Sequence, residues 1–292
     1  MSRVTRVGIV AKANLCQATP HLVEIEAWLR ARGLEPIFET TTAALMPAAR
    51  RRVTDKTALV GETDLIVVLG GDGTLLSVAD SVASAGRDVP ILGVNFGSLG
   101  FLTEATLPEL YPSLEAALSG RTRVEERMML RGATLRNGQA LPGRLALNDV
   151  VITKAARARM TDLSVSLDDE FVTRVKADGL IVATPTGSTA YNLAAGGPIV
   201  QPTIEALVLT PIAPHMLTNR PIVIPATSLV RVQPQMTERD ELYVTFDGQT
   251  GYELRAGDEV QICCAERRVR LLRPSSRSYF DVLRQKLKWN ER

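Results

Sequence analysis

One segment of the 292-residue chain restricts its possible folds more than any other. An apolar run, Leu65 to Leu69, is followed directly by the turn Gly70-Gly71-Asp72-Gly73-Thr74, and helical character resumes from Leu75 to Ala83. A strand that is apolar on both faces is typical of the centre of a parallel sheet with helices on both sides. The segment therefore predicts a parallel strand, a tight turn and a helix, which is the repeating unit of an α/β layer.

The rest of the first 121 residues repeats this alternation. Thr19-Pro20 predicts a helix with threonine as its N-cap, because proline is favoured at the first helical position, and Gly33 should end that helix. Leu22, Ile25 and Leu29 recur between them at helical spacing. Strands are expected at 7–10, 34–39 and 90–94, and a further helix at 107–118. The alternation predicts a doubly wound α/β domain over residues 1–121.

After residue 122 the pattern changes to strict alternation, as in Leu163-Ser164-Val165-Ser166-Leu167. Asn137-Gly138 is a hairpin signal, and Asp178-Gly179 and Asp247-Gly248 indicate further turns. We expect an all-β, sandwich-like domain of two packed sheets over residues 122–273. Residues 274–292 should form a helix that returns to the first domain. Its apolar stripe would be Phe280, Leu283 and Leu287.

Composition limits the possible partners and compartments. A net charge of +2 is too small to indicate a nucleic acid or a membrane surface, and the run Arg50 to Arg52 is best interpreted as a solvated helix face. The three cysteines, Cys16, Cys263 and Cys264, show no CxxC spacing and are odd in number, so no disulfide framework is expected. With no signal peptide or membrane-span pattern, we expect a cytoplasmic protein.

The glycine turn after the central strand suggests phosphate chemistry. Glycines let backbone N–H groups approach phosphate oxygens, and the following helix adds its positive end. The carboxylate of Asp72 would repel phosphates unless it has another task. It could accept the proton of an attacking hydroxyl or hold Mg²⁺. The alternative is a tight turn with an ordinary turn aspartate.

Two other polar segments allow both a structural and a functional interpretation. The loop Asn95 to Leu102 is either anchored in the core by its two phenylalanines or forms a flexible rim over a phosphate site, where an aromatic ring could lie against a purine. Asn148 and Asp149 either cap a turn or grip an adenine edge and a ribose diol.

The segment Lys176 to Pro198 combines a charged turn, a buried strand and a hydroxyl-rich proline–glycine turn that opens a short helix. Thr186, Ser188 and Thr189 either cap that helix or leave its start free to meet an anionic or polar ligand.

These motifs carry a resemblance to a known family. The turn GGDGT at 70–74 is shared by NAD kinases and by diacylglycerol and sphingosine kinases, and phosphofructokinases have a variant of it. Residues 95–102 resemble the NxGxLGFL segment of NAD kinases. Residues 176–198 resemble their DGLIxxTPTGSTAYxLxAGGPI signature nearly residue for residue. Fewer residues match the family in three later segments, 210–215, 219–221 and 247–249. With these segments, the resemblance to bacterial-type NAD kinases covers essentially the whole chain.

The resemblance implies an activity: transfer of a phosphoryl group from ATP, with Mg²⁺, to the 2′-hydroxyl of the adenosine ribose of NAD, giving NADP. Inorganic polyphosphate is a possible second donor. Asp72 would be the general base, with Gly73 beside the bound nucleotide, and no protein metal-ligand set is assigned. A homodimer or homotetramer is implied, in which β-domains complete neighbouring sites.

The resemblance also implies a set of NAD-contacting residues. Asp149 stands where the family has glutamate, Asp178 would accept from the nicotinamide amide, and Arg159 and Lys176 would supply positive charge. The remaining expected contacts are Asn148, Thr189, Ala190, Tyr191, Asn192, Leu193, Ala194, Ala213 and Gln249.

Two other functions are compatible with parts of the sequence. A lipid kinase shares GGDGT, but nothing in the chain suggests a deep apolar groove, and the TPTGSTAY segment argues against that class. A catalytically silent module that binds NAD or NADP would keep the fold, but the presence of Asp72 argues against it.

Overall fold

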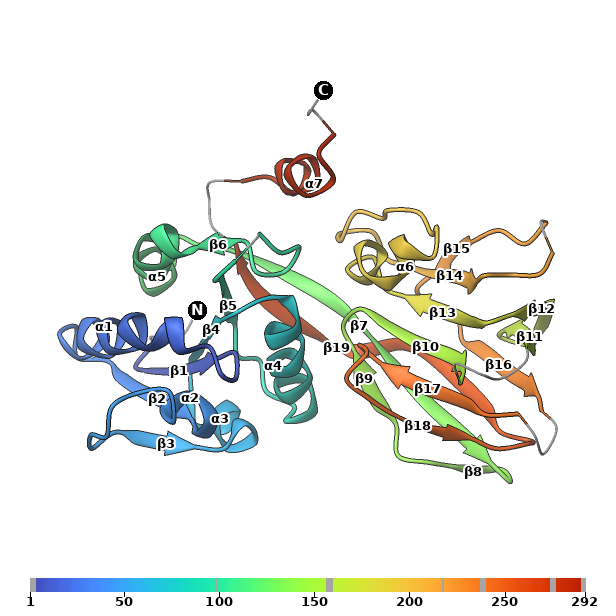
Figure 1. Ribbon diagram of the computed structural model, residues 1–292, viewed down its shortest axis with the longest axis horizontal. Helices are drawn as coiled ribbons and strands as arrows, with labels where there is room; N and C mark the ends of the chain where they lie inside the picture. The colour runs from blue at the N-terminus through green and yellow to red at the C-terminus, as the bar shows by residue number, and fades with distance from the viewer. Residues whose placement is uncertain are drawn as a thin grey trace. The chain divides into compact units, whose positions relative to one another are not determined.

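The computed structural model describes residues 4–97, 99–155, 160–216, 218–236, 240–273 and 277–289 (Figure 1). The chain divides into two compact units, one of residues 1–126 with 269–292 and one of residues 127–268. Both divisions fall inside long strands, β7 (Arg123–Arg136) and β19 (Glu259–Arg273). No helix of the described ranges is long and apolar enough to cross a bilayer.

The first unit is an α/β layer, as expected. Its strands are β1 (Arg6–Ala11), β2 (Glu35–Glu39), β3 (Arg52–Thr54), β4 (Leu65–Leu69), β5 (Ile91–Asn95) and the short β6 (Ala105–Thr106). Its α-helices are α1 (Thr19–Arg30), α2 (Thr40–Ala43), α3 (Lys56–Glu62), α4 (Asp72–Ser84), α5 (Leu110–Leu118) and α7 (Tyr279–Leu287), with 3-10 turns η1 (Cys16–Ala18) and η2 (Leu107–Glu109).

The strand order of this sheet fixes where a ligand can bind. The strands pair in parallel in the order β3-β2-β1-β4-β5, and the last residues of β19 add to β5. The chain order reverses between β1 and β4, which makes their carboxyl ends the switch point where open α/β sheets bind ligands. Lys12 follows β1 and Gly70 follows β4 there, and Lys12 N donates to Leu69 O at 2.9 Å.

The predicted apolar patterns in this unit are confirmed by burial. All five residues of β4 are fully buried, as are Leu22, Ile25 and Leu29 of α1. Thr19 is not the N-cap. The helix begins at Thr19 itself, with Ala18 as N-cap, and the threonine hydroxyl donates to Leu45 O instead.

The prediction that Arg50 to Arg52 lie on a solvated helix face is wrong. Arg50 and Arg51 lie outside any helix or strand, and Arg52 begins β3. Arg51 pairs with Glu26, and Arg52 with Glu35 and Glu62. A three-residue strand is too short to show a recognisable alternation in the sequence. The arginines are positioned by carboxylates from other elements of the unit.

The C-terminal helix belongs to the first unit, but its buried side differs from the prediction. Val282 and Leu283 are buried, whereas Phe280 is 53% exposed and Leu287 is half-buried. A capping box between Ser278 and Asp281 sets the start of the helix. The expected stripe was therefore correct only at Leu283.

The second unit is the expected antiparallel β-sandwich. One sheet has the order β15-β14-β13-β10-β17-β18, and the other places β12, β11, β16 and β19 side by side. The elements are β8 (Gln139–Ala140), β9 (Arg144–Ala146), β10 (Asp149–Lys154), β11 (Thr161–Leu167), β12 (Glu170–Ala177), β13 (Gly179–Ala183), β14 (Ala206–Ile212), β15 (Ile222–Pro225), β16 (Val230–Gln235), β17 (Leu242–Phe246), β18 (Thr250–Leu254), η3 (Gly187–Thr189) and α6 (Tyr191–Ala194).

Alternating residues from both sheets form one core. Leu163 and Val165 of β11 face Val150, Val182 and other apolar residues of the opposite sheet in a single buried cluster. The turns Asn137-Gly138 and Asp247-Gly248 both have positive φ at these two residues. Asn137-Gly138 is the whole loop of a two-residue hairpin, whereas three residues, 247–249, link β17 to β18. The turn at Asp178 links β12 to β13 and carries the chain from one sheet to the other.

Candidate active site

In the first unit, Asp72 is held by a loop that closes over it. The residue begins α4, and its carboxylate accepts from four donors: Phe101 N to Oδ2 at 2.9 Å, and Leu102 N, Thr103 N and Thr103 Oγ1 to Oδ1 at 2.9–3.1 Å. The glycine turn and the loop therefore form one structure that fixes the orientation of the carboxylate.

The two carboxylate oxygens of Asp72 differ in what they can still bind. Oδ1 receives three hydrogen bonds and Oδ2 only one. Each ionised carboxylate oxygen has about two lone-pair sites, so Oδ2 can accept one more donor, such as a substrate hydroxyl. The carboxylate is half-buried beside a pocket of about 370 Å³. This arrangement fits the interpretation of Asp72 as a residue that orients a substrate hydroxyl better than it fits the interpretation as an ordinary turn aspartate.

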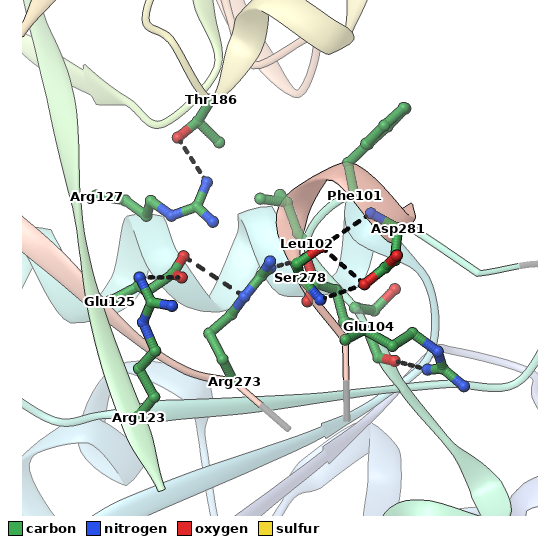
Figure 2. A network of polar contacts seen from close by, with 12 residues as sticks. Phe101, Leu102, Glu104, Arg123, Glu125, Arg127, Thr186, Arg273, Ser278 and Asp281 are labelled. Carbon is green, nitrogen blue, oxygen red and sulfur yellow. Dashed lines mark hydrogen bonds and ion pairs between the residues drawn. The ribbon is translucent and has the colours of Figure 1, made fainter. Parts of the chain in front are cut away.

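The loop is itself anchored by buried polar side chains. Asn95 Nδ2 donates to Thr103 Oγ1 at 2.9 Å, and Asn95 Oδ1 accepts from Gly97 N. Glu104, which follows Thr103, is 1% exposed and pairs with Arg273. Figure 2 shows Arg273 between Glu104 and Glu125, and burial lowers the pKa of its guanidinium to about 10. Thr103 thus positions Asp72, a role that the sequence interpretation missed.

Phe96 was expected either in the core or at the rim of the phosphate site, and it contacts both. It is half-buried, packs against the apolar core of the unit and lies edge-on to His21 with ring centroids 5.5 Å apart. It also lines the pocket beside Asp72.

Gly100 is required by this geometry. A Cβ atom there would collide with Asp72 Oδ1 and Thr103 Oγ1, whereas a Cβ at Gly97 would come no closer than 3.7 Å to another group. We therefore expect Gly100→Ala to lower kcat about 10²-fold by displacing the carboxylate, and Gly97→Ala to have little effect. Initial rates of the two variants test this, and equal rates would contradict the positional role of Gly100.

In the second unit, Asn148 and Asp149 lie at the end of the sheet where β10 begins. The Asp247 carboxylate accepts from the backbone N–H groups of Leu147, Asn148 and Asp149 at 2.7–3.1 Å. Asp149 is 4% exposed, and burial together with the charge of Asp247 raises its pKa to about 7. A carboxylate this far above its ordinary pKa is typical of functional sites.

The TPTGST turn lies against the same segment. Thr184 N donates to Asn148 O at 2.8 Å, and Thr184 Oγ1 donates to Leu147 O at 2.6 Å. A Cβ at Gly187 would collide with the Asn148 carbonyl. The structure therefore brings together two motifs that lie far apart in the sequence, and it explains why this turn requires glycine.

Of the two interpretations of the hydroxyls in this turn, capping of the short helix is not observed. The N-cap of α6 is Ala190 with no side-chain bond, and the helix has only four residues. Ser188 Oγ bonds to Pro185 O and to both backbone groups of Val200, and Thr189 Oγ1 bonds to Thr186 O. Thr186 Oγ1 accepts from Arg127, as Figure 2 shows. The hydroxyls close the turn and leave the start of α6 without a side-chain cap.

The residues around α6 that are predicted to contact NAD differ in how exposed their side chains are. Tyr191 is 46% exposed and Ala194 is exposed, whereas Thr189, Ala190 and Leu193 are half-buried. Asn192 is fully buried, and its amide bonds to Ser188 O, Pro198 O and Thr210 Oγ1. Its side chain therefore positions the helix, and only its backbone remains available to a ligand.

The remaining predicted contacts fall into two groups at opposite ends of the sheet. Gln249 is exposed in the turn after β17, at the Asp149 end, because Asp247 N donates to Asp149 O. Asp178 and Ala213 lie at the other end, where Gly179 pairs with Ile212. Strand β13 has five residues, so about 17 Å of strand separates the two ends.

At that far end, Asp178 is half-buried and pairs with Lys154 Nζ at 3.5 Å. Lys176 is exposed, and its carbonyl accepts from His215 N. Ala213 has φ of +45°, an uncommon conformation for a residue with a side chain, which is often found at binding sites. Arg159 lies outside the described residues.

Within the described residues, no group of three or more His, Cys, Asp or Glu side chains is placed to hold a metal ion. Cys16, Cys263 and Cys264 are free thiols.

The parallel sheet of the first unit, with a glycine turn and an oriented carboxylate at its switch point, has the features that phosphoryl transfer to a hydroxyl requires. Two family models match the chain: the ATP-NAD kinase N-terminal domain over residues 7–122 and the ATP-NAD kinase C-terminal domain over residues 147–274. The NAD kinase of Geotalea daltonii is 49% identical over 98% of this chain and 99% of the relative, and that of Syntrophotalea carbinolica is 50% identical with the same coverage.

Solved structures agree with these matches. Yeast NADH kinase complexed with NADH superposes with a TM-score of 0.90 at 26% identity, covering 100% of this chain and 90% of that one. An NAD kinase from Archaeoglobus fulgidus in complex with ATP gives 0.77 at 28% identity, covering 96% and 99%. The chain belongs to the NAD kinase family.

Proposed function

We propose that the protein transfers the terminal phosphoryl group of ATP to the 2′-hydroxyl of the adenosine ribose of NAD and so produces NADP. The observation that supports this most directly is the Asp72 carboxylate, which lines a pocket, is held by four donors and keeps one acceptor position free on Oδ2. Full-length relatives that are NAD kinases support the choice of acceptor and donor.

The chemistry requires Asp72 to position the hydroxyl and take up its proton. Oδ2 accepts the hydrogen bond of the 2′-hydroxyl, which directs the oxygen lone pair at the phosphorus atom. As the new O–P bond forms and the bond to ADP breaks, the hydroxyl proton passes to Oδ2. In a loose transition state this transfer is late, so orientation contributes more than basicity.

In the second unit, the proposed acceptor site is built around Asn148 and Asp149. The ionised Asp149 carboxylate can accept from the neighbouring 3′-hydroxyl of that ribose, and the Asn148 amide can pair with an adenine edge. The exposed Tyr191 and the backbone of residues 189–194 supply the neighbouring surface.

Magnesium would enter with ATP as part of the substrate. Asp72 is the carboxylate among the residues that line its pocket, together with glycines and two lysines. This fits an ion that is bound mainly by phosphate oxygens and water, as Mg²⁺ commonly is in such sites. When bound, it neutralises negative charge on the transferring phosphoryl group.

We also propose that the protein works as a homo-oligomer. A dinucleotide held at Asp149 would need to bridge the length of the sheet to reach Asp178 and Ala213 of the same chain. The second group is better placed to complete the site of another copy. A mixture of Asp72→Asn and Asp178→Ala chains should then regain activity on subunit exchange. A monomer in light scattering would contradict the proposal.

The activity is tested by the initial rate of NADP formation from NAD, ATP and Mg²⁺, measured with an NADP-specific dehydrogenase. Magnesium-dependent formation of NADP is expected. If the protein binds NAD tightly but forms no product with ATP or polyphosphate, and does not phosphorylate NADH, it is a binding module and the proposal is wrong.

A further inference from the structure

We propose that Lys12 and Lys286 bind the terminal phosphates of the phosphoryl donor beside Asp72. The inference rests on the proposed function, because it assigns residues to the donor half of that reaction. Neither lysine belongs to a motif that the sequence analysis singled out. They come from opposite ends of the chain and are brought to one pocket only by the fold of the first unit.

The pocket next to Asp72 has a volume of about 370 Å³. One part of its wall is the backbone of Gly70, Gly71 and Gly100, and its charged side chains are Asp72, Lys12 and Lys286. A Cβ at Gly71 would meet no atom within 4 Å, so the space over its backbone is open. The pocket therefore offers open glycine backbone and two cations around one carboxylate.

Lys12 is placed by the sheet topology. It follows β1 at the switch point, and its Cβ would lie 3.2 Å from a Cβ on Gly70. Its side chain is exposed, and no carboxylate of the described residues forms an ion pair with it. A lysine at the carboxyl ends of two central parallel strands lies where an anionic ligand of this fold binds.

Lys286 is placed by the C-terminal helix. Val282 and Leu283 bury one side of α7, and the Nζ atom of Lys286 lies 5.7 Å from the ring centroid of Phe101. Phe101 N is the donor to Asp72 Oδ2. The ammonium group is therefore held next to the loop that binds the catalytic carboxylate, and within the described ranges it pairs with no carboxylate.

Charge explains why two lysines are needed here. The phosphates of ATP and the Asp72 carboxylate are both negative, and like charges only a few Å apart repel each other strongly in a partly buried site. Two ammonium groups that are not neutralised by protein carboxylates offset this repulsion. They can also donate charge-assisted hydrogen bonds to phosphate oxygens.

A second pocket suggests how the donor is oriented. It has a volume of about 340 Å³, and it shares Lys12 and Gly71 with the first pocket while adding Lys56, Thr74 and Glu39. One oxygen of the Glu39 carboxylate accepts three hydrogen bonds from Thr41 and Thr42, which offset part of its charge. A triphosphate that crosses Gly71 would place its terminal phosphoryl group next to Asp72 and its remaining phosphates in the second pocket. Lys12 would then contact both parts of the chain.

The test compares Lys12→Met and Lys286→Met with Lys288→Met, an exposed lysine of the same C-terminal segment that lines neither pocket. Each of the first two variants should raise the KM for ATP about 10- to 100-fold, as the loss of a charge-assisted contact predicts. The Kd for NAD, measured by calorimetry, should stay the same, and Lys288→Met should match the wild type. Lys12→Arg and Lys286→Arg should recover part of the loss.

Binding of the Mg²⁺ complex of AMP-PNP separates this inference from the proposed function. If the wild type forms NADP and the methionine variants keep its KM for ATP, the lysines do not bind the donor and the inference is wrong. If the wild type forms no NADP, the proposed function fails, and weaker AMP-PNP binding by the variants would still support the lysine assignment. Unchanged AMP-PNP binding overturns it.

Discussion

Replacing Asp72 by asparagine is expected to lower kcat for NADP formation about 10²- to 10⁴-fold, the usual contribution of a general base. Affinity for NAD should be nearly unchanged, because the proposed adenosine contacts lie in the second unit. The amide oxygen can still accept from Leu102 N and Thr103 N, so most of the contacts that close the loop remain, although the bond from Phe101 N is lost. It cannot take up the proton of the attacking hydroxyl.

Asp80→Asn is a matched control, because Asp80 lies on the same helix, α4, outside the pocket lining. Its kcat should equal that of the wild type. Rates and NAD affinities of both variants should be measured alongside their thermal unfolding, which separates lost chemistry from lost structure. If folded Asp72→Asn kept its turnover, Asp72 would not be the base.

Replacing Asp149 by asparagine is expected to stabilise the free protein at alkaline pH and to weaken NAD binding. The pKa of Asp149 is raised from 3.8 to about 7, first by burial and then by the charge of Asp247. A raised carboxyl pKa means that the folded state holds a proton that the unfolded state releases. Stability from this group is therefore fully present below pH 3.8 and is lost as the pH rises to about 7.

The size of the effect follows from the same pKa. At pH 8 the ionised Asp149 costs the folded state about 4 kcal/mol, which Asp149→Asn would remove. At pH 5 the gain should be less than half as large. Because the ionised form is the acceptor for the ribose 3′-hydroxyl, NAD affinity of the wild type should fall as the pH drops below 7, and affinity of the variant should be low throughout.

Asp258→Asn provides a control in the same unit, because it should change stability at alkaline pH in the opposite direction. Burial works against the ionised form of Asp258, but the hydrogen bonds from Arg136 and from Arg255 N outweigh it and lower its pKa. Its contribution to stability is present at alkaline pH and lost in acid, so Asp258→Asn should destabilise the protein at pH 8. Urea unfolding at pH 5 and pH 8 tests both variants, and a pH-independent effect of Asp149→Asn would contradict the raised pKa.

The sequence predicted those elements whose pattern is local. The apolar run 65–69, the stripe of Leu22, Ile25 and Leu29, and the alternation along β11 each show their own period, and each is buried as expected. The positive-φ turns at Asn137 and Asp247 were also recognisable, because only a few residue types adopt that conformation.

The features that the sequence could not predict depend on distant contacts. Thr103 binds Asp72 across 31 residues, and Lys12 and Lys286 line one pocket from opposite ends of the chain. The hydroxyls of the TPTGST turn were expected at a helix start but bond to backbone groups such as those of Val200. The C-terminal stripe was misplaced, because apolar spacing alone pointed to Phe280 and Leu287, whereas Val282 and Leu283 are the buried residues of α7.

The central claim is that this chain transfers the terminal phosphoryl group of ATP to one hydroxyl of NAD. It is tested most directly by incubating the wild type with ATP labelled in that group and locating the label by phosphorus NMR of the purified dinucleotide. We expect a single new phosphate on the 2′-oxygen of the adenosine ribose, dependent on Mg²⁺ and on Asp72. Label found only in inorganic phosphate, or on another hydroxyl, would contradict it.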